Sequence, residues 1–149
     1  MDWFNLVISN KTIVIPFTLW FAIQIFKTIT DLVRYKRFDV KRIMGAGGMP
    51  SSHSAVVCSV ATCMGFEYGL DSGIFALSVA FAFIVMYDAA GVRRAAGKQA
   101  KILNKILQTP GLSKVEIQEK LTEALGHTPI QVIVGAIIGI LVPILVYTL

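Results

Sequence analysis

The chain ends in a stretch from Ile130 to Leu149 that is apolar almost throughout and contains no charged side chain. An α-helix needs about 20 apolar residues to cross the hydrocarbon core of a bilayer. Because the bilayer core has no water to satisfy backbone N–H and C=O groups, such a segment must be helical. Composition agrees, since the chain is 55% hydrophobic and only 15% charged. The sequence therefore predicts an integral membrane protein.

Three further apolar runs precede this segment, at Ile13 to Phe26, Pro50 to Phe66 and Gly73 to Tyr87. None of them shows the period-two alternation of a barrel strand. We therefore expect an all-α polytopic membrane bundle of about four transmembrane helices, forming a single domain over residues 1–149. The two inner runs are short, so a buried helical hairpin is the alternative for them.

The basic residues set the expected topology. One basic group follows the first run and another follows the third, whereas the loop between the second and third carries only Glu67 and Asp71. The positive-inside rule places both basic loops in the cytoplasm and both chain ends outside. No cleavable signal peptide is expected, because Asp2 stands where a basic residue would be needed. The net charge of +5 then reflects topology, and we expect no nucleic-acid partner.

The segment from Ala95 to Leu125 mixes apolar residues with lysine, glutamate and glutamine, and is interrupted by Thr109 to Gly111. This pattern predicts two amphipathic helices on the cytoplasmic side, lying on the membrane or folded over the mouth of the bundle. A solvated pair of connecting helices is the alternative.

Cationic and titratable side chains from four segments converge on the cytoplasmic face in this topology. Lys27 and Arg34 follow the first run, His53 opens the second, Arg93 and Arg94 follow the third, and His127 precedes the fourth. Helices that begin near Ser51 and Thr128 would add free backbone N–H groups. Since guanidinium groups suit phosphate oxygens, we expect a phosphate site, and at a membrane the phosphate belongs to a lipid.

Two histidines that face one phosphate indicate chemistry as well as binding. One imidazole can attack phosphorus while the other donates a proton to the leaving oxygen, and this needs no metal or cofactor. Asp88, at the end of an apolar run, is a further candidate because ionisable groups at such depth are often functional. The alternatives are an ion pair between Asp88 and Arg93 or Arg94, and simple membrane anchoring by these arginines.

Metal and disulfide chemistry is not expected. Cys58 and Cys63 are five residues apart in an apolar run, which fits small buried side chains better than a metal or redox motif. A non-haem iron site formed by His53, His127 and Asp88 is a weaker alternative, because no cysteine or second carboxylate is near in sequence.

Four stretches resemble the type 2 phosphatidic acid phosphatase superfamily, which includes vanadium haloperoxidases. "PSSH" at Pro50 to His53 is similar to its P-S-G-H motif, and Lys27 and Arg34 have the K-x6-R spacing of its first motif. "GHTPIQVIVGAIIG", Gly126 to Gly139, resembles its third motif. Together with "GGMPSSHSA" and "YDAAGVRRAAGKQA", these stretches most resemble the divergent branch of the superfamily, over nearly the whole chain.

The resemblance implies a membrane phosphatase or phosphotransferase that acts on a lipid or isoprenoid phosphate through a phosphohistidine. His127 would be the nucleophile and His53 the general acid. Phosphate would be held by Lys27, Arg34, Ser51 and the backbone of Ser52 and His53. Gly135 and Gly139 match the family's packing glycines, and their G-x3-G spacing would also allow a homo-oligomer to form through this face.

Three positions depart from the family pattern. Gln131 stands where the family has an aspartate that orients the nucleophile, so an uncharged acceptor takes that place. Leu121 replaces the third-motif arginine, and Tyr35 replaces a first-motif proline. Arg93 or Arg94 and Asp88 could compensate for the missing charges. The alternative function is a non-catalytic membrane protein that binds phosphorylated lipid head groups for transport, for sensing or as a subunit of a complex.

Overall fold

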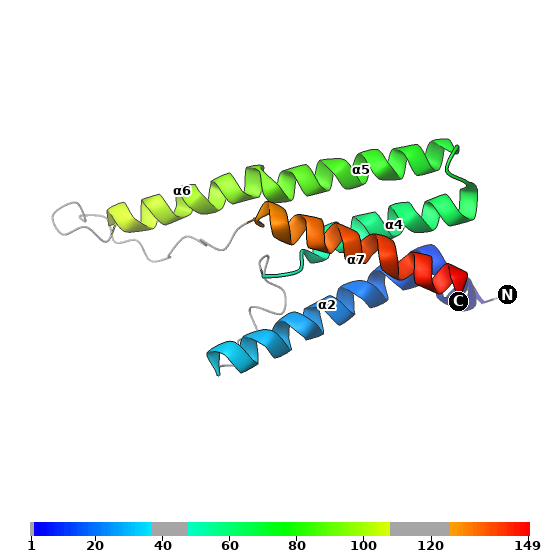
Figure 1. The fold of residues 1–149 in the computed structure, drawn as a ribbon, viewed down its shortest axis with the longest axis horizontal. Coiled ribbons are helices and arrows are strands. Elements are labelled where there is room, and N and C mark those ends of the chain that lie inside the picture. The colour runs from blue at the N-terminus through cyan, green and yellow to red at the C-terminus, as the bar shows by residue number, and fades with distance from the viewer. Residues whose placement is uncertain (1, 37–47, 108–125) are drawn as a thin grey trace.

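The computed structural model describes residues 2–36, 48–107 and 126–149, and every regular element within them is a helix. The elements are α1 (Trp3–Ser9), α2 (Lys11–Tyr35), α4 (Ser52–Tyr68), α5 (Gly73–Ala90), α6 (Val92–Leu107) and α7 (Pro129–Thr148). Figure 1 shows α2, α4, α5 and α7 gathered into one bundle, with both chain termini at the same end. The expectation of an all-α membrane bundle is thus confirmed.

Three stretches of this bundle are long and apolar enough to cross a membrane: Lys11–Val33, Gly73–Ile106 and Pro129–Thr148. Large apolar side chains such as Phe17, Phe21 and Ile133 are exposed on their outer faces, as lipid contact requires. The second apolar run forms α4, which has only 17 residues and is about 25 Å long. Of the four expected spans, three therefore meet the length and composition of a span, and α4 is an inner helix.

The inner position of α4 is visible in its packing, because α2, α5 and α7 all contact it. One apolar cluster joins Leu19 and Ile23 of α2 to Ala55 of α4. A second cluster joins Val57 and Cys58 of α4 to Ala82 of α5. In this way α4 becomes the common core of the bundle, and its small side chains let three helices approach it.

Both cysteines belong to this core. Cys58 and Cys63 are buried free thiols, and the Cys58 Sγ lies 3.7 Å from the Sδ of Met86 on α5. The expectation that they are small buried side chains is confirmed.

The closest approach in the bundle is between α4 and α7, which run in the same direction (Figure 1). A Cβ atom added to Gly135 would overlap the carbonyl oxygen of Ser51, and one added to Gly139 would overlap that of Ala55. Gly135 and Gly139 are four residues apart on α7, as Ser51 and Ala55 are at the start of α4. The G-x3-G face of α7 therefore packs directly on α4. Within this chain the face is taken up by α4, and association of two copies through it stays a prediction.

Side chains also join these helices at the end of the bundle that carries the two chain termini. The Tyr147 hydroxyl of α7 donates a hydrogen bond to Glu67 Oε1 of α4, and its ring stacks on Phe66 with centroids 4.7 Å apart. Lys11 Nζ of α2 lies 4.6 Å from the centroid of the Tyr147 ring. These contacts join three helices at the end that carries both termini.

The first part of the segment expected to be amphipathic forms α6, whereas residues 108–125, including Leu121, lie outside the described part of the chain. Among the described elements α6 contacts only α5. Figure 1 shows that it continues roughly in line with α5, beyond the end of the bundle. It does not fold over the bundle mouth. Its placement on the membrane surface and the alternative of a solvated connecting helix both stay predictions.

Candidate functional site

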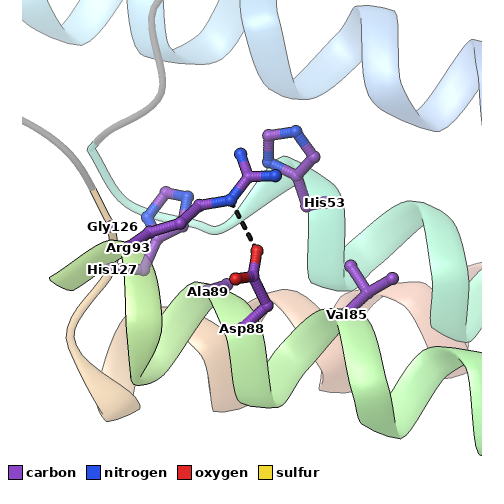
Figure 2. A pocket seen from close by; sticks show the side chains of 7 residues that line it. All are labelled: His53, Val85, Asp88, Ala89, Arg93, Gly126 and His127. Carbon is purple, nitrogen blue, oxygen red and sulfur yellow. Dashed lines mark hydrogen bonds and ion pairs between the residues drawn. The ribbon is translucent and has the colours of Figure 1, made fainter. Parts of the chain in front are cut away.

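A pocket lies at the end of the bundle opposite the termini, where the start of α4, the end of α5 and the turn before α7 meet (Figure 2). Seven residues line it: His53, Val85, Asp88, Ala89, Arg93, Gly126 and His127. Four of them are among the residues singled out from the sequence, and they come from four different segments.

The start of α4 forms one wall of the pocket. Ser51 caps the helix, since its Oγ accepts a hydrogen bond from the backbone N–H of Ser54 (3.3 Å). The backbone N–H of Ser51 donates to the Gln131 carbonyl on α7 (3.1 Å), which ties this turn to the next helix. The amides of Ser52 and His53 stand in the first turn, where no intrahelical acceptor exists. This helix end therefore keeps two N–H groups and a positive dipole end for an anion.

The turn from Gly126 to Thr128 forms a second wall. Gly126 has φ +82°, and a Cβ atom there would overlap the backbone of Arg93 and Arg94. Glycine is needed for both reasons, because other residues rarely adopt this φ and no space exists for a side chain. The backbone N–H of His127 then donates to the Ala89 carbonyl (2.9 Å). The turn is thus held against the end of α5, and His127 is placed in the pocket.

The two histidines differ in burial but face one another. His127 is 3% exposed, and neither of its ring nitrogens has a hydrogen-bond partner among the described residues. His53 is more exposed, and the two ring centroids are 6.4 Å apart with a tilt of 56°. A buried polar group without a partner costs free energy. Its position in the wall of the pocket makes the His127 ring a candidate for contact with a ligand.

Both imidazoles are biased towards the neutral form by their surroundings. Burial lowers the pKa of His127, and the nearby charge of Lys27 lowers it further. Burial also lowers the pKa of His53, and the charge of Arg93 adds to this effect. A bound anion would oppose these charges, so anion binding is expected to be coupled to proton uptake.

We expect the ligand-free protein to lose thermal stability as the pH falls from about 7.5 to about 5.5. A histidine with a lowered folded pKa binds more protons when unfolded, so its stabilisation is present above pH 6.5, the ordinary histidine value, and is lost below it. The chain has two histidines, so a double variant with His53→Gln and His127→Gln should lose most of this dependence. Unfolding temperatures in detergent measure it, and a native protein that becomes more stable on acidification would contradict the neutral assignment.

Arg93 and Asp88 form an ion pair at the pocket edge, with Arg93 Nε 2.6 Å from Asp88 Oδ2. Figure 2 shows the Arg93 guanidinium extending between the two imidazoles, with the Asp88 carboxylate beneath it. The alternative of an ion pair for Asp88 is therefore realised, and it is realised inside the pocket. Arg94 does not line the pocket, because it is the next residue on α6 and projects about 100° further around the helix.

Lys27 approaches the same place from α2. Its Nζ donates a 3.4 Å hydrogen bond to Ser52 Oγ in the first turn of α4. Lys27 stands beside the pocket rather than among its lining residues. The backbone of Arg34 continues α2 for seven residues beyond Lys27, or about 10 Å, and its side chain lies outside the described part.

Comparisons with known proteins agree with this arrangement. No solved structure matches the chain. A Bacillus subtilis (strain 168) protein named "Uncharacterized membrane protein YuiD" is 42% identical, over 79% of this chain and 82% of its own length. The model of the Divergent PAP2 family matches residues 8–142. The chain belongs to the Divergent PAP2 family. Its membership explains the likeness between its polar segments and the phosphatase motifs.

Gln131 lies in the first turn of α7 in this divergent PAP2 protein and caps that helix. Its side-chain Oε1 accepts from the backbone N–H of Thr128 (2.9 Å), and Thr128 Oγ1 accepts from the backbone N–H of Gln131 (3.4 Å). The two residues form a capping box at the start of α7. Gln131 Oε1 therefore caps the helix, and its orienting role towards His127 stays a prediction.

The same capping box distinguishes the two helix ends that were expected to bind phosphate. At α7, Thr128 and Gln131 satisfy each other's N–H groups and Pro129 has none. At α4, the first-turn amides stay available beside Lys27. The first turn of α4 is thus the helix start whose free amides lie beside Lys27, and the "GHTP" turn contributes His127 to the pocket.

The described residues contain no group of three or more His, Cys, Asp or Glu side chains that could hold a metal ion. The alternative of an iron site at His53, His127 and Asp88 therefore has no support in this part of the chain. Asp88 is instead paired with Arg93.

Some residues of the site were not singled out from the sequence, notably the Ala89 carbonyl, Gly126 as a spacer, and Val85. Thr128 and Gln131 did carry a readable signal, because T-x-x-Q before an apolar run is a capping box. Nothing local marks Ala89, since its role depends on a contact with a turn that lies far away in sequence.

Proposed function

We propose that this divergent PAP2 protein is a membrane phosphatase or phosphotransferase that acts on a lipid or isoprenoid phosphate through a phosphohistidine on His127. The carrying observation is the buried His127 imidazole, whose nitrogens have no hydrogen-bond partner among the described residues, in a pocket that also contains His53. A histidine kept neutral by its surroundings has the lone pair that a nucleophile needs.

The pocket supplies positive groups for the phosphate oxygens. Arg93 reaches in from α6, and Lys27 stands beside Ser52 on the opposite side. The amides of Ser52 and His53 add the positive end of α4, and we propose that Arg34 and Ser51 complete the set, with Arg94 at its edge. Such pre-arranged donors stabilise charge that develops on a transferring phosphoryl group.

The reaction follows from the two imidazoles. A ring nitrogen of His127 forms a bond to phosphorus, the bond to the leaving oxygen breaks, and His53 gives that oxygen a proton. Water, or an acceptor alcohol in a transferase, then attacks the phosphohistidine, and His53 takes a proton from it. If each histidine lies ~3 Å from the atom it reacts with, the two reacting ring nitrogens are ~6–8 Å apart. The ring centroids of His53 and His127 are 6.4 Å apart.

Asp88 fits a role in this cycle through Arg93. The Asp88 carboxylate neutralises the Arg93 guanidinium in the structure. A phosphate that binds Arg93 would replace Asp88 as the partner of the guanidinium. Asp88 would then be free to accept a hydrogen bond from a protonated histidine. This would supply, from α5, the carboxylate that the third motif lacks.

The substrate proposed is a lipid because the pocket lies at the end of a bundle whose helices are apolar on their outer faces. From the basic loops and the positive-inside rule, we propose that this end lies in the cytoplasm and both termini outside. We further propose that residues 1–149 act as one domain, without a nucleic-acid partner, a metal or a cofactor.

The test is phosphate release by purified protein in detergent, without added metal. The panel contains phosphatidic acid, phosphatidylglycerol phosphate, and polyprenyl mono- and diphosphates. Release from at least one substrate, lost in His127→Ala, is the expected result. If folded protein releases phosphate from none of these substrates, the catalytic proposal is wrong.

A second candidate function is binding of phosphorylated lipid head groups without catalysis, for transport, sensing or as a subunit of a complex. The use of Gln131 Oε1 in a helix cap favours it. Asp88 is also held by Arg93, so no carboxylate hydrogen-bonds to His127 among the described residues. In this case the pocket would bind phosphate by the same groups, with no bond to phosphorus formed.

Gln131→Asp is expected to separate these two functions. Aspartate in the first turn can still cap α7, and it adds a negative charge near His127. If the site is catalytic, phosphate release should rise by about tenfold or more, since loss of an anionic orienter costs about 10⁴-fold in a serine protease. Gln131→Asn is the matched uncharged control. Unchanged release in a folded Gln131→Asp variant favours the binding protein.

A further inference from the structure

One face of α4 is covered by no helix that the structure describes. His53, Val56, Val60 and Met64 recur at helical spacing, fall within an arc of about 80°, and together form the open face of α4. His53 is exposed and the other three side chains are half-buried, whereas Ala55 on the far side of the helix is fully buried. The helix at the core of the bundle thus keeps one row of side chains accessible.

The neighbouring helices border the open face without closing it. Ser52 and Val57 lie just beyond its two edges by helical spacing. Ser52 contacts Lys27 of α2, and Val57 belongs to the cluster with Ala82 of α5. Helix α7 packs on the Ala55 carbonyl at the back, and α2 and α5 do not contact each other. The open face therefore lies between α2 and α5, on the side of α4 away from α7.

The open face begins at the pocket and continues into the membrane. Its first residue, His53, lines the pocket together with Val85 of α5. In Figure 2 both side chains lie on the side of the pocket from which α4 and α5 continue into the bundle. Phe81 lies one turn from Val85, and Trp20 lies two turns from Lys27 on the same face of α2; both are exposed. The polar pocket is thus continuous with an apolar strip.

The length of the open face matches one leaflet of a bilayer. His53 and Met64 are eleven residues apart, or about 16 Å along the helix. Half of a hydrocarbon core of about 30 Å is about 15 Å. A lipid chain whose phosphate lies in the pocket would therefore reach Met64 near the middle of the membrane.

Positive charges flank the beginning of the open face. Lys27 approaches from α2 through its contact with Ser52, and Arg93 lines the pocket. Burial lowers the pKa of His53, and the charges of Arg93 and Lys27 each lower it further, so both cations lie near this ring. A phosphate that arrives between α2 and α5 would meet a cation on each side.

We propose that the open face of α4 holds the hydrocarbon chain of the lipid whose phosphate occupies the pocket, so that the lipid enters sideways from the cytoplasmic leaflet between α2 and α5. The inference rests on the proposed lipid-phosphate site, whether that site is catalytic or only binds. The chain gains little by leaving the surrounding lipid, which is equally apolar. The phosphate therefore supplies the affinity, and the open face selects the chains that pack well enough to bring it to His53.

The pocket favours a lipid chain over a protein helix on the open face. A helix packed there would stand against His53 and block the route from the bilayer to the pocket. A phosphorylated lipid instead matches both parts of the strip, because its head group is anionic where the protein is cationic and its chain is apolar beside Val60 and Met64. Charge and hydropathy along α4 thus fit a single ligand.

The test measures where the chain of a bound lipid lies. Lys27 contacts Ser52, and α2 and α4 run in opposite directions from this point (Figure 1). Trp20 and Val60 are therefore at nearly the same depth, about 10–12 Å further into the bundle. The chain has two tryptophans, so a Trp3→Phe background makes the fluorescence of Trp20 a reporter on the open face.

The probe is an alkyl phosphonate with bromine in the middle of its chain, which quenches tryptophan at contact and cannot be hydrolysed. It is added to the full chain in lipid nanodiscs, and its binding is followed separately by a radiolabel. We expect saturable quenching of Trp20 that brominated phosphatidylcholine at the same concentration does not produce. Unlabelled phosphatidic acid and polyprenyl phosphate serve as competitors, and the one that reverses quenching at the lower concentration identifies the kind of chain.

A variant that fills the open face completes the test. Val60→Phe should raise the half-saturating concentration of the phosphonate by about tenfold, because the larger ring takes the space of the chain. Ile133→Phe is the matched control, since Ile133 is exposed on the outer face of α7, and it should leave binding unchanged.

Four results would overturn the inference. A phosphonate that binds without quenching Trp20, and equally well to Val60→Phe, would place the chain elsewhere and leave the proposed phosphate site intact. Equal quenching by brominated phosphatidylcholine would mean that ordinary bilayer lipid covers the face. Quenching by neither lipid would mean that a segment of this chain or a second copy covers it. A phosphonate that does not bind at all would remove the proposed phosphate site as well.

Discussion

Replacing His127 by alanine is expected to lower phosphate release by three orders of magnitude or more, as loss of a catalytic nucleophile does in serine proteases. The reason is structural, because His127 is buried in the pocket and its ring nitrogens have no hydrogen-bond partner among the described residues. Alanine leaves the backbone bond from residue 127 to Ala89 intact, so the turn should keep its place. Purified protein with a labelled substrate measures the loss, together with the acid-labile phosphate that the native chain should carry.

His53 provides the control that separates a nucleophile from a general acid. His53→Ala should lower release by about 10²–10⁴-fold for an alcohol leaving group. The defect should shrink for a leaving group that needs no proton, such as a nitrophenolate, whereas the His127→Ala defect should not. Equal defects for both leaving groups would contradict the roles assigned to the two residues. Lipid-phosphate binding that survives in both variants would show that the site is still folded.

Adding one methyl group at Gly139 is expected to destabilise the whole bundle. The new Cβ would overlap the Ala55 carbonyl, which is helix backbone and cannot move alone. Overpacking of this kind costs about 1–3 kcal/mol, and Gly135→Ala should add a similar loss by overlapping Ser51. The yield of folded protein and its unfolding temperature in detergent measure the effect.

Gly73→Ala is the matched control, because a Cβ atom at Gly73 meets nothing within 4 Å. It should leave stability nearly unchanged. If Gly139→Ala keeps its stability but loses self-association, then α7 uses this face between copies rather than against α4. Loss of stability in Gly73→Ala as well would point to a general effect on helix starts.

Much of the site could be predicted because helix starts follow local rules. Proline and serine before an apolar run predicted a helix that starts at Pro50 or Ser51, and α4 starts at Ser52 with Ser51 as its cap. His53 and His127 each lie close to the start of a helix. Because the basic loops predict that both helices start on the same side of the membrane, the two histidines could be placed at the same end of the bundle. The capping box of Thr128 and Gln131 follows equally local rules and could have been read in advance.

Other features could not be predicted because they depend on contacts between distant segments. Arg93 and Arg94 are equivalent in sequence, and only the direction of α6 relative to the 126–128 turn selects Arg93 for the pocket. Lys27 meets Ser52 only because α2 packs on α4. The spacing of Gly135 and Gly139 indicates a close helix contact but does not name the helix.

The amino-acid sequence alone was sufficient for the membrane class, the helical fold and the set of polar residues at one end. Hydropathy, helix capping and charge in loops act over a few residues, so they can be read without coordinates. Packing was required to show that α4 is the core, that its open end faces Lys27, and that Asp88 holds Arg93. These depend on which helix faces meet, and that is set by shape complementarity over the whole chain.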